Sequence, residues 1–126
     1  AVRVTGAANE DDARQVAKTI ATSVLVKTAV YGGDPNWGRV LAAAGRSGVE
    51  LDPSRCALWF AGDGGSEFQV VSGGTPLAYD ESEAARIFAC RDLAIHLGLG
   101  AGAAEATVWT SDLTHEYVTL NAHYRT

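Results

Sequence analysis

The chain has 126 residues, a length that fits one domain. An apolar fraction of 47% with only 20% charged residues excludes a disordered chain, and every apolar stretch is too short to span a bilayer. The 10 Lys+Arg and 15 Asp+Glu give a net charge of −5, so the chain lacks the positive field that nucleic acids and anionic membranes attract. We therefore expect no nucleic-acid partner and no membrane partner.

The start of the chain and its cysteines indicate its context. The sequence begins with Ala1 and contains 0 Met, and residues 1–5 already alternate as a strand does. We therefore expect Ala1 to be an internal position of a longer polypeptide. No signal-peptide pattern is present, and the 2 Cys, Cys56 and Cys90, are too few for a disulfide framework. The sequence predicts two buried free thiols and a cytoplasmic protein.

Periodicity predicts four elements in the first half of the chain. Residues 1–5 form a half-buried strand, and residues 10–22 carry apolar side chains at helical spacing, with Asn9 as the N-cap. The β-branched run over residues 24–30 predicts a buried strand. Residues 40–44 form a short helix that ends at one of the following glycines, Gly45 or Gly48.

The second half predicts strands separated by glycine turns, and one helix. The predicted elements are strands over 57–60 and 68–71, a helix that begins at Asp80 or Ser82, strands over 93–97 and 104–109, and a short helix over 114–120. The link 98–102 lacks the Lys-Ser/Thr of a nucleotide loop and precedes a strand, so we interpret it as a hairpin turn.

The alternation of these elements predicts an α+β fold. We expect a mixed sheet of short strands with two to four packed helices, in a single domain over residues 1–126. The pattern does not predict the order of the strands in the sheet.

The histidines do not form a metal-binding pattern. His96 lies in the middle of an apolar strand and is expected to be a hydrogen-bonded residue of the sheet. His115 and His123 have Asp112 and Glu116 nearby, but their spacing is not typical of a metal site. We expect no metal and no resident cofactor.

The segment 31–39 is rich in glycine and aromatic residues and precedes the helix over 40–44. Asp34 could cap that helix, with Pro35 in its first turn, where a missing N–H costs nothing. A purely structural role and a role in lining a site both remain open at this point.

The C-terminal segment 112–126 is unlike an ordinary solvated terminus. It carries apolar side chains almost to its last residue, namely Leu113, Tyr117, Val118, Leu120 and Tyr124. We expect it to dock against the domain, which would hold Asn121, Thr126 and the terminal carboxylate in fixed positions.

Three segments resemble one enzyme family. Residues 25–43, with the string Asp-Pro-Asn-Trp-Gly-Arg at 34–39, are similar to the hallmark segment of the bifunctional glutamate N-acetyltransferase/ornithine acetyltransferase of arginine biosynthesis. Residues 112–126 resemble the C-terminus of that family, and residues 4–8 resemble the strand that precedes its helix. The resemblance covers essentially the whole chain.

The resemblance implies an acyltransferase that cleaves itself into an alpha and a beta chain. The Thr that begins the beta chain is the nucleophile, and its own α-amine acts as base. This Thr takes the acetyl group from N-acetyl-ornithine and gives it to glutamate, and some members of the family also use acetyl-CoA. The sequence does not decide whether acetyl-CoA is a donor here.

Ala1 has no hydroxyl, so this chain resembles the C-terminal part of the beta chain, without the nucleophile segment. The resemblance implies that the chain alone is inactive and contains no catalytic residue. Its partners would be the alpha chain and the rest of the beta chain, in a hetero-oligomer of processed chains, with N-acetyl-ornithine and glutamate as substrates.

Two substrate-binding positions of the family correspond to Asn121 and Thr126. Their amide and hydroxyl can donate to and accept from the carboxylate and amine of an amino acid. The loop 34–39 is expected to be scaffold near the active site. The alternatives are a non-catalytic assembly and stability module with a buried tail, and an unrelated small-molecule-binding α+β domain.

Overall fold

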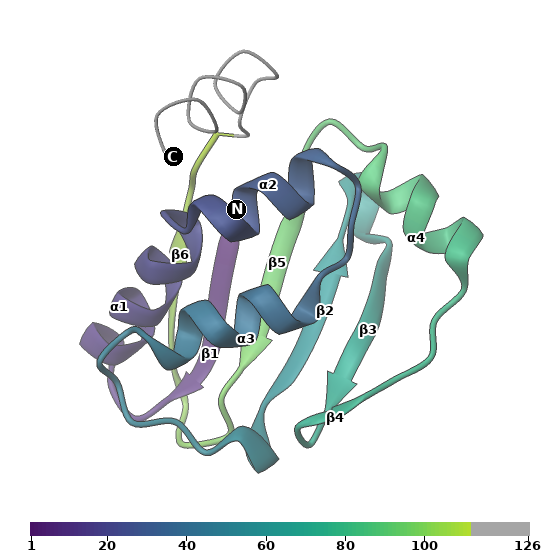
Figure 1. Ribbon diagram of the computed structural model, residues 1–126. Coiled ribbons are helices and arrows are strands. Elements are labelled where there is room, and N and C mark those ends of the chain that lie inside the picture. The colour runs from purple at the N-terminus through teal and green to yellow at the C-terminus, as the bar shows by residue number, and fades with distance from the viewer. Residues whose placement is uncertain (112–126) are drawn as a thin grey trace, which may run out of the picture.

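The computed structural model describes residues 1–111 (Figure 1). They form a six-stranded sheet with the order β4-β3-β2-β5-β1-β6. The strands are β1 (Val2–Ala7), β2 (Ala57–Ala61), β3 (Glu67–Ser72), β4 (Thr75–Pro76), β5 (Ala94–Gly98) and β6 (Ala104–Val108). β1 and β5 are parallel and the other neighbours are antiparallel, which confirms the mixed sheet.

Four α-helices are found within the described residues, which confirms the α+β fold. They are α1 (Glu10–Ala21), α2 (Val24–Tyr31), α3 (Trp37–Gly45) and α4 (Glu81–Phe88), with 3-10 turns at η1 (Pro53–Arg55) and η2 (Asp63–Gly65). None of these helices is long and apolar enough to cross a membrane. The expected helix over 114–120 lies outside the described residues.

The helices cover one face of the sheet (Figure 1). α1 packs on β1 and β6 and contacts α3, which in turn contacts α2. On β1, Val2 and Val4 are buried against this layer whereas Arg3 is exposed on the other face. The ring of Phe88 on α4 packs against Phe60 of β2, with 5.1 Å between the ring centroids, so the core lies between the helices and one side of the sheet.

Local capping signals determine where the helices begin. The side chain of Asn9 accepts from the backbone N–H of Asp12 at 2.8 Å, as expected for the N-cap of α1. Asp80 caps α4 through bonds from the N–H groups of Ser82 and Glu83 at 2.8 and 3.1 Å. The N-cap of α4 is therefore Asp80, the first of the two residues predicted.

Residues 24–30, predicted as a buried strand, lie in α2. The hydroxyl of Ser23 caps this helix by accepting from the N–H of Val26 at 3.3 Å, and Val26 and Ala29 face the core at helical spacing. The preference of β-branched residues for strands amounts to only about 1 kcal/mol across its scale, so packing overrides it. Both edges of β1 are already paired, with β5 and β6, so a strand over residues 24–30 could not pair with β1.

The link 98–102 is not a hairpin turn. β5 and β6 do not pair with each other, because β1 lies between them. The link instead passes the carboxyl end of β1, where the backbone N–H groups of Ala101 and Gly102 donate to the carbonyl of Gly6 at 2.7 and 2.8 Å. A glycine spacing that is typical of a tight turn serves here to bring two backbones into close contact.

We predict that Gly6→Ala destabilises the fold more than Gly33→Ala. The two glycines have nearly the same backbone φ, +70° and +71°, which costs about 1–2 kcal/mol for a residue with a side chain. A Cβ at Gly6 would lie 2.9 Å from the backbone nitrogen of Gly100, whereas a Cβ at Gly33 meets nothing within 4 Å. Urea unfolding should show an extra loss of about 1–3 kcal/mol for Gly6→Ala. Equal losses would contradict the close contact.

Candidate functional site

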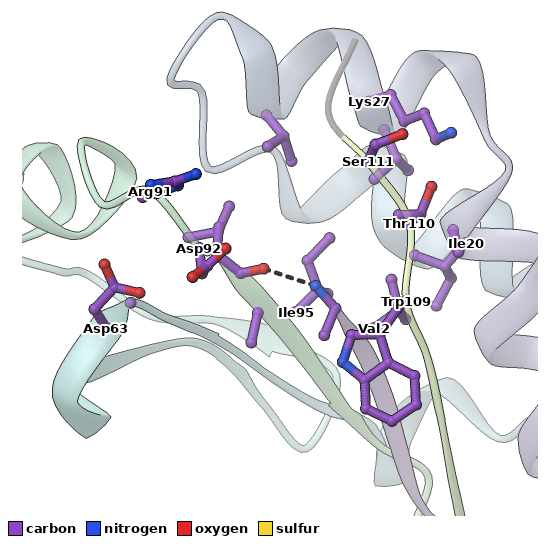
Figure 2. Close-up of a pocket in the computed structure, with 17 residues that line it drawn as sticks. Val2, Ile20, Lys27, Asp63, Arg91, Asp92, Ile95, Trp109, Thr110 and Ser111 are labelled. Carbon is purple, nitrogen blue, oxygen red and sulfur yellow. Dashed lines mark hydrogen bonds between the residues drawn. The ribbon is translucent and has the colours of Figure 1, made fainter.

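A cleft of about 640 Å³ opens at the edge of the sheet where β1 and β5 begin (Figure 2). Its apolar lining comes from the starts of β1 and β5, the end of α1 and one side of α2, and includes Val2, Ile20, Val26, Val30 and Ile95. Trp109, the residue after β6, also lines the cleft and has 78% of its surface exposed. The volume is in the range of small-molecule sites, which are typically about 300–1,000 Å³.

The rim of the cleft carries charged and hydroxyl side chains. Lys27 of α2 lies near Thr110 and Ser111, whereas Arg91, Asp92 and Asp63 lie toward the opposite end (Figure 2). Among residues 1–111, no hydrogen bond or ion pair engages these four charged side chains. The cleft therefore presents an apolar floor between a cationic end and an end that carries both signs of charge.

Both limits of the described chain lie at this cleft. The N-terminal amine of Ala1 donates to the carbonyl of Leu93 at 2.9 Å, and both residues line the cleft together with Ser111. The expected substrate-binding residues Asn121 and Thr126 lie outside the described residues, as do His115 and His123. Within residues 1–111, no group of three or more His, Cys, Asp or Glu side chains could hold a metal ion.

Sequence analysis did not identify the charged residues of the cleft. Lys27, Asp63, Arg91 and Asp92 come from segments that are distant in sequence and carry no recognisable motif. They meet because β1 and β5 are parallel, so that both strands begin at the same edge of the sheet. Predicting that these residues lie together would have required the order of the strands in the sheet, which the sequence does not predict.

The loop 34–39 holds two helices together. Asn36, and not Asp34, is the N-cap of α3: its Oδ1 accepts from the backbone N–H of Arg39 at 3.0 Å. Asp34 accepts from the side-chain amide of Asn36 at 3.2 Å, and Pro35 precedes the cap instead of lying in the first turn. Arg39 donates to the carbonyl of Leu25 in α2 at 3.0 Å. No residue of this loop lines the cleft, which favours the structural interpretation.

We predict that Asn36→Ala lowers the free energy of unfolding by about 1 kcal/mol, because it removes an N-cap. Asp34→Ala is the matched control and should cost less, since it removes only an exposed bond to the Asn36 side chain. Urea unfolding of both variants measures the difference. A larger loss for Asp34→Ala would make Asp34 the functional cap and contradict the geometry.

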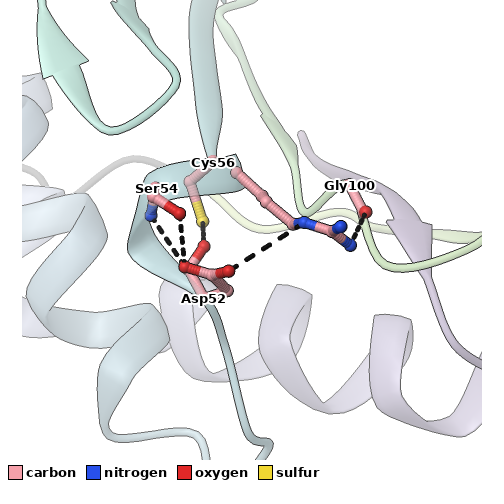
Figure 3. A network of polar contacts seen from close by, with 5 residues as sticks. Asp52, Ser54, Cys56 and Gly100 are labelled. Atoms are coloured by element: carbon pink, nitrogen blue, oxygen red, sulfur yellow. Dashed lines mark hydrogen bonds and ion pairs between the residues drawn. The ribbon is translucent and has the colours of Figure 1, made fainter.

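A second polar network surrounds η1 and has a structural role (Figure 3). Asp52 accepts from the hydroxyl and the backbone N–H of Ser54 at 2.7 and 3.1 Å, and these bonds hold the pKa of its carboxyl below the usual value. Arg55 donates to the carbonyl of Gly100 at 3.2 Å. The network joins the start of β2 to the link between β5 and β6.

The two cysteines are free thiols, as predicted. Cys56 is buried, and desolvation raises the pKa of its thiol, with Asp52 adding to the effect. A raised thiol pKa is the reverse of what an activated nucleophile requires. Cys90 is only partly buried, so the expectation of a buried thiol is wrong for this residue.

His96 is a sheet residue, as expected. Its Nε2 and the hydroxyl of Thr5 lie 2.9 Å apart, and its ring stacks on Trp59 with centroids 4.7 Å apart. Burial is the main reason that its pKa is lowered, and Arg3 adds to this effect while Glu67 and Glu105 oppose it. No carboxylate within residues 1–111 hydrogen-bonds the ring, so the Thr–His pair lacks the third group that orients a catalytic base.

We predict that acid destabilises the protein partly through His96. Because the folded pKa is below the ordinary value of 6.5, the unfolded state binds the proton more readily. The contribution of neutral His96 to stability is therefore complete above that value and is lost as the pH falls below it. Urea unfolding at about pH 7.5 and about pH 5.5 should show a larger decrease for the wild type than for His96→Gln. Equal decreases would contradict the lowered pKa.

The described residues thus define a class of protein. It is a two-layer α+β domain with a cleft at one edge of its sheet, and this cleft has an apolar lining and charged residues at its rim. Comparison with known proteins gives the family. The profile of the ArgJ family matches residues 1–126. A protein of Methanosarcina mazei named glutamate N-acetyltransferase is 51% identical, over 98% of this chain and 31% of its own length. The chain belongs to the ArgJ family.

Two further relatives agree with this assignment. The mitochondrial arginine biosynthesis bifunctional protein ArgJ of Heterostelium pallidum is 48% identical over 99% of this chain and 32% of its own length. The crystal structure of the same-named protein from Bacillus halodurans has a TM-score of 0.81 and 38% identity, covering 98% of this chain and 56% of that chain. The chain therefore spans about a third of the length of the curated relatives it matches.

Proposed function

We propose that this chain is part of an acetyltransferase of arginine biosynthesis that moves an acetyl group from N-acetyl-ornithine to glutamate. The observation that carries the proposal is the match of all 126 residues to the ArgJ family. Its relatives are named a bifunctional protein of arginine biosynthesis and a glutamate N-acetyltransferase, and these names indicate acetyl transfer to glutamate. The cleft supports the proposal because its volume and its charges of both signs suit a small molecule that carries both charges.

The nucleophile of the proposed reaction lies outside this chain. The family resemblance implies this location, and two observations on residues 1–111 support it: burial raises the pKa of the Cys56 thiol, and no third group orients the Thr5–His96 pair. In the proposed mechanism, a Thr hydroxyl at the start of the beta chain attacks the acetyl carbonyl of N-acetyl-ornithine. An ester forms, the amide C–N bond breaks, and ornithine leaves with the hydroxyl proton, carried by the α-amine of that Thr. The amine of glutamate then attacks the ester and restores the Thr hydroxyl.

Asn121 and Thr126 are the substrate-binding residues that this chain would contribute. The segment 112–126 follows Ser111, which lines the cleft. An extended chain covers about 3.3–3.6 Å per residue, so both residues are within reach of the cleft. There, the amide of Asn121 and the hydroxyl of Thr126 would bind the head group of the amino acid.

We predict that Asn121→Ala in the full-length enzyme raises KM for N-acetyl-ornithine about tenfold, the loss of one bond to a charged group, and changes kcat little. Thr126→Val tests the second residue in the same way, with the exposed Thr22→Val as the control. Acetyl transfer measured with both substrates reports these values. Absence of acetyl transfer by the wild type would overturn the proposed function, and unchanged kinetics in both variants would overturn only the two residues.

The alternative role is a non-catalytic assembly module. Under that alternative, removing residues 125–126 alters the oligomeric state of the alpha and beta chains but leaves acetyl transfer unchanged. Under our proposal, the same deletion raises KM, and the 126-residue chain without the rest of the enzyme transfers no acetyl group. The cytoplasmic location stays a prediction, since the relatives include a mitochondrial protein and others named without a compartment.

A further inference from the structure

The two edge strands of the sheet differ in how they are protected. β4 has only two residues, Thr75 and Pro76, and its proline has no N–H group to donate to another strand. β6 (Ala104–Val108) has five residues and contains no proline, glycine or lysine. Among residues 1–111, its backbone pairs only with β1, so its outer edge has no partner strand (Figure 1). The N–H and C=O groups along such an edge form a template for a further strand.

The charge on β6 does not block this edge. Glu105 is the only charged residue of the strand, and its Oε2 lies 3.3 Å from Nη2 of Arg3 in β1. The carboxylate is thus directed over the sheet, toward the inner neighbour, and does not project beyond the edge. Thr107 and Val108 are β-branched, as is typical of residues in paired strands. The sequence of β6 therefore suits an inner strand better than a protected edge.

Among the antiparallel registers that keep the helices of both copies on the same side of the sheet, one fits a second copy of β6 best. With Ala106 opposite Ala106 of the other copy, Glu105 lies opposite Thr107, and no like charges face each other. A shift of the centre to Glu105 would place two carboxylates directly opposite each other, which is destabilising. A shift to Thr107 would leave Ala104 and Glu105 without a partner in the other β6. Only the register centred on Ala106 pairs the whole strand without repulsion.

The helix layer supports a second copy as the occupant of this edge. α1 packs on β1 and β6. Its first turn lies near Ala7 at the end of β1, and Ile20 lies near Val2 at the start of β1, so α1 runs in the same direction as β6. The two copies of α1 would therefore run antiparallel to each other across the joined edges. Residues 10–12 in the first turn are acidic and Lys18 lies in the last turn, so ends of opposite charge would lie side by side.

We propose that β6 pairs antiparallel with β6 of a second copy, about a two-fold axis at Ala106, so that the two sheets become one continuous sheet. The same surface is used by both copies, so the contact closes on itself and gives a dimer instead of a fibre. This inference goes beyond the proposed function, because it concerns assembly and requires no acetyl transfer. Its tests therefore succeed or fail independently of that function.

The first test cross-links the proposed axis in the full-length protein. Directly opposite residues have Cα atoms about 4.5–5.5 Å apart, within the range of about 4.4–6.8 Å that a disulfide bond spans. Ala106→Cys should therefore form a disulfide-linked dimer under mild oxidation, seen by gel electrophoresis without reductant. Ala104→Cys is the matched control in the same strand, and it should not form this product because its own copy lies about 13 Å along the strand.

The wild type gives the background from the cysteines that it already contains, Cys56 and Cys90 among them. Equal cross-linking of Ala106→Cys and Ala104→Cys would contradict the proposed register. Absence of the linked dimer in both variants would contradict the pairing of the two edges.

The second test measures dimer stability and does not depend on a new cysteine. Thr107→Glu places a carboxylate opposite Glu105 of the other copy at two positions in the dimer, whereas in its own copy residue 107 lies opposite Arg3, which tolerates the added charge. Sedimentation equilibrium of the full-length protein should show a dissociation constant that is about two- to thirtyfold higher. Thr75→Glu, in the other edge strand, is the matched control and should leave this constant unchanged.

A rescue variant separates repulsion from a general loss of structure. Adding Glu105→Gln to Thr107→Glu removes the like charges and should restore most of the dimer affinity. A monomeric wild type, or equal dissociation constants for Thr107→Glu and Thr75→Glu, would overturn the proposal. An edge of β6 that another part of the full-length protein covers would give that same result.

Discussion

The pairing of β1 with β5 and β6 is the constraint on which the rest of the structure depends. β1 runs parallel to β5, with Val2 opposite Ile95, and antiparallel to β6, with Val2 opposite Val108. This register places the start of the chain, the start of β5 and the end of β6 at one edge of the sheet. The cleft exists because these three backbone segments end there while α2 covers one side of them. The close contact of Gly6 with the link after β5 secures the opposite end of the same strand.

The hallmark loop and the cleft belong to different parts of the domain. Asn36 caps α3 and Arg39 fastens it to α2, so the loop fixes the position of the helix that carries Lys27 without lining the cleft itself. The residues that make this sequence recognisable thus act on the cleft through the backbone of α2. Within residues 1–111, the motif thus determines how α2 and α3 are joined and lines no part of the cleft.

The sequence predicts those features that depend on neighbouring residues. The caps Asn9 and Asp80 are correct because a cap needs only the next turn of chain, and most strands follow from alternation. The prediction of a strand over residues 24–30 is wrong because strand propensity is weak compared with packing. The prediction of a hairpin turn over residues 98–102 is wrong because strand pairing is a long-range property. The charged residues of the cleft were missed for the same reason, whereas Asn121 and Thr126 depend on family resemblance and lie outside the described residues.

The position of β1 also has a consequence for how the chain acquires its structure. β1 has its two neighbours at the far end of the described residues, since Ala1 bonds to Leu93 and Arg3 to Glu105. The loops that must close are long, and their entropy opposes pairing until nearly the whole segment has been synthesised. Until then α1 can form on its own, but the strands that flank β1 in residues 1–111 are still missing. Within residues 1–111, β1 can therefore complete its pairing only after β5 and β6 have been synthesised.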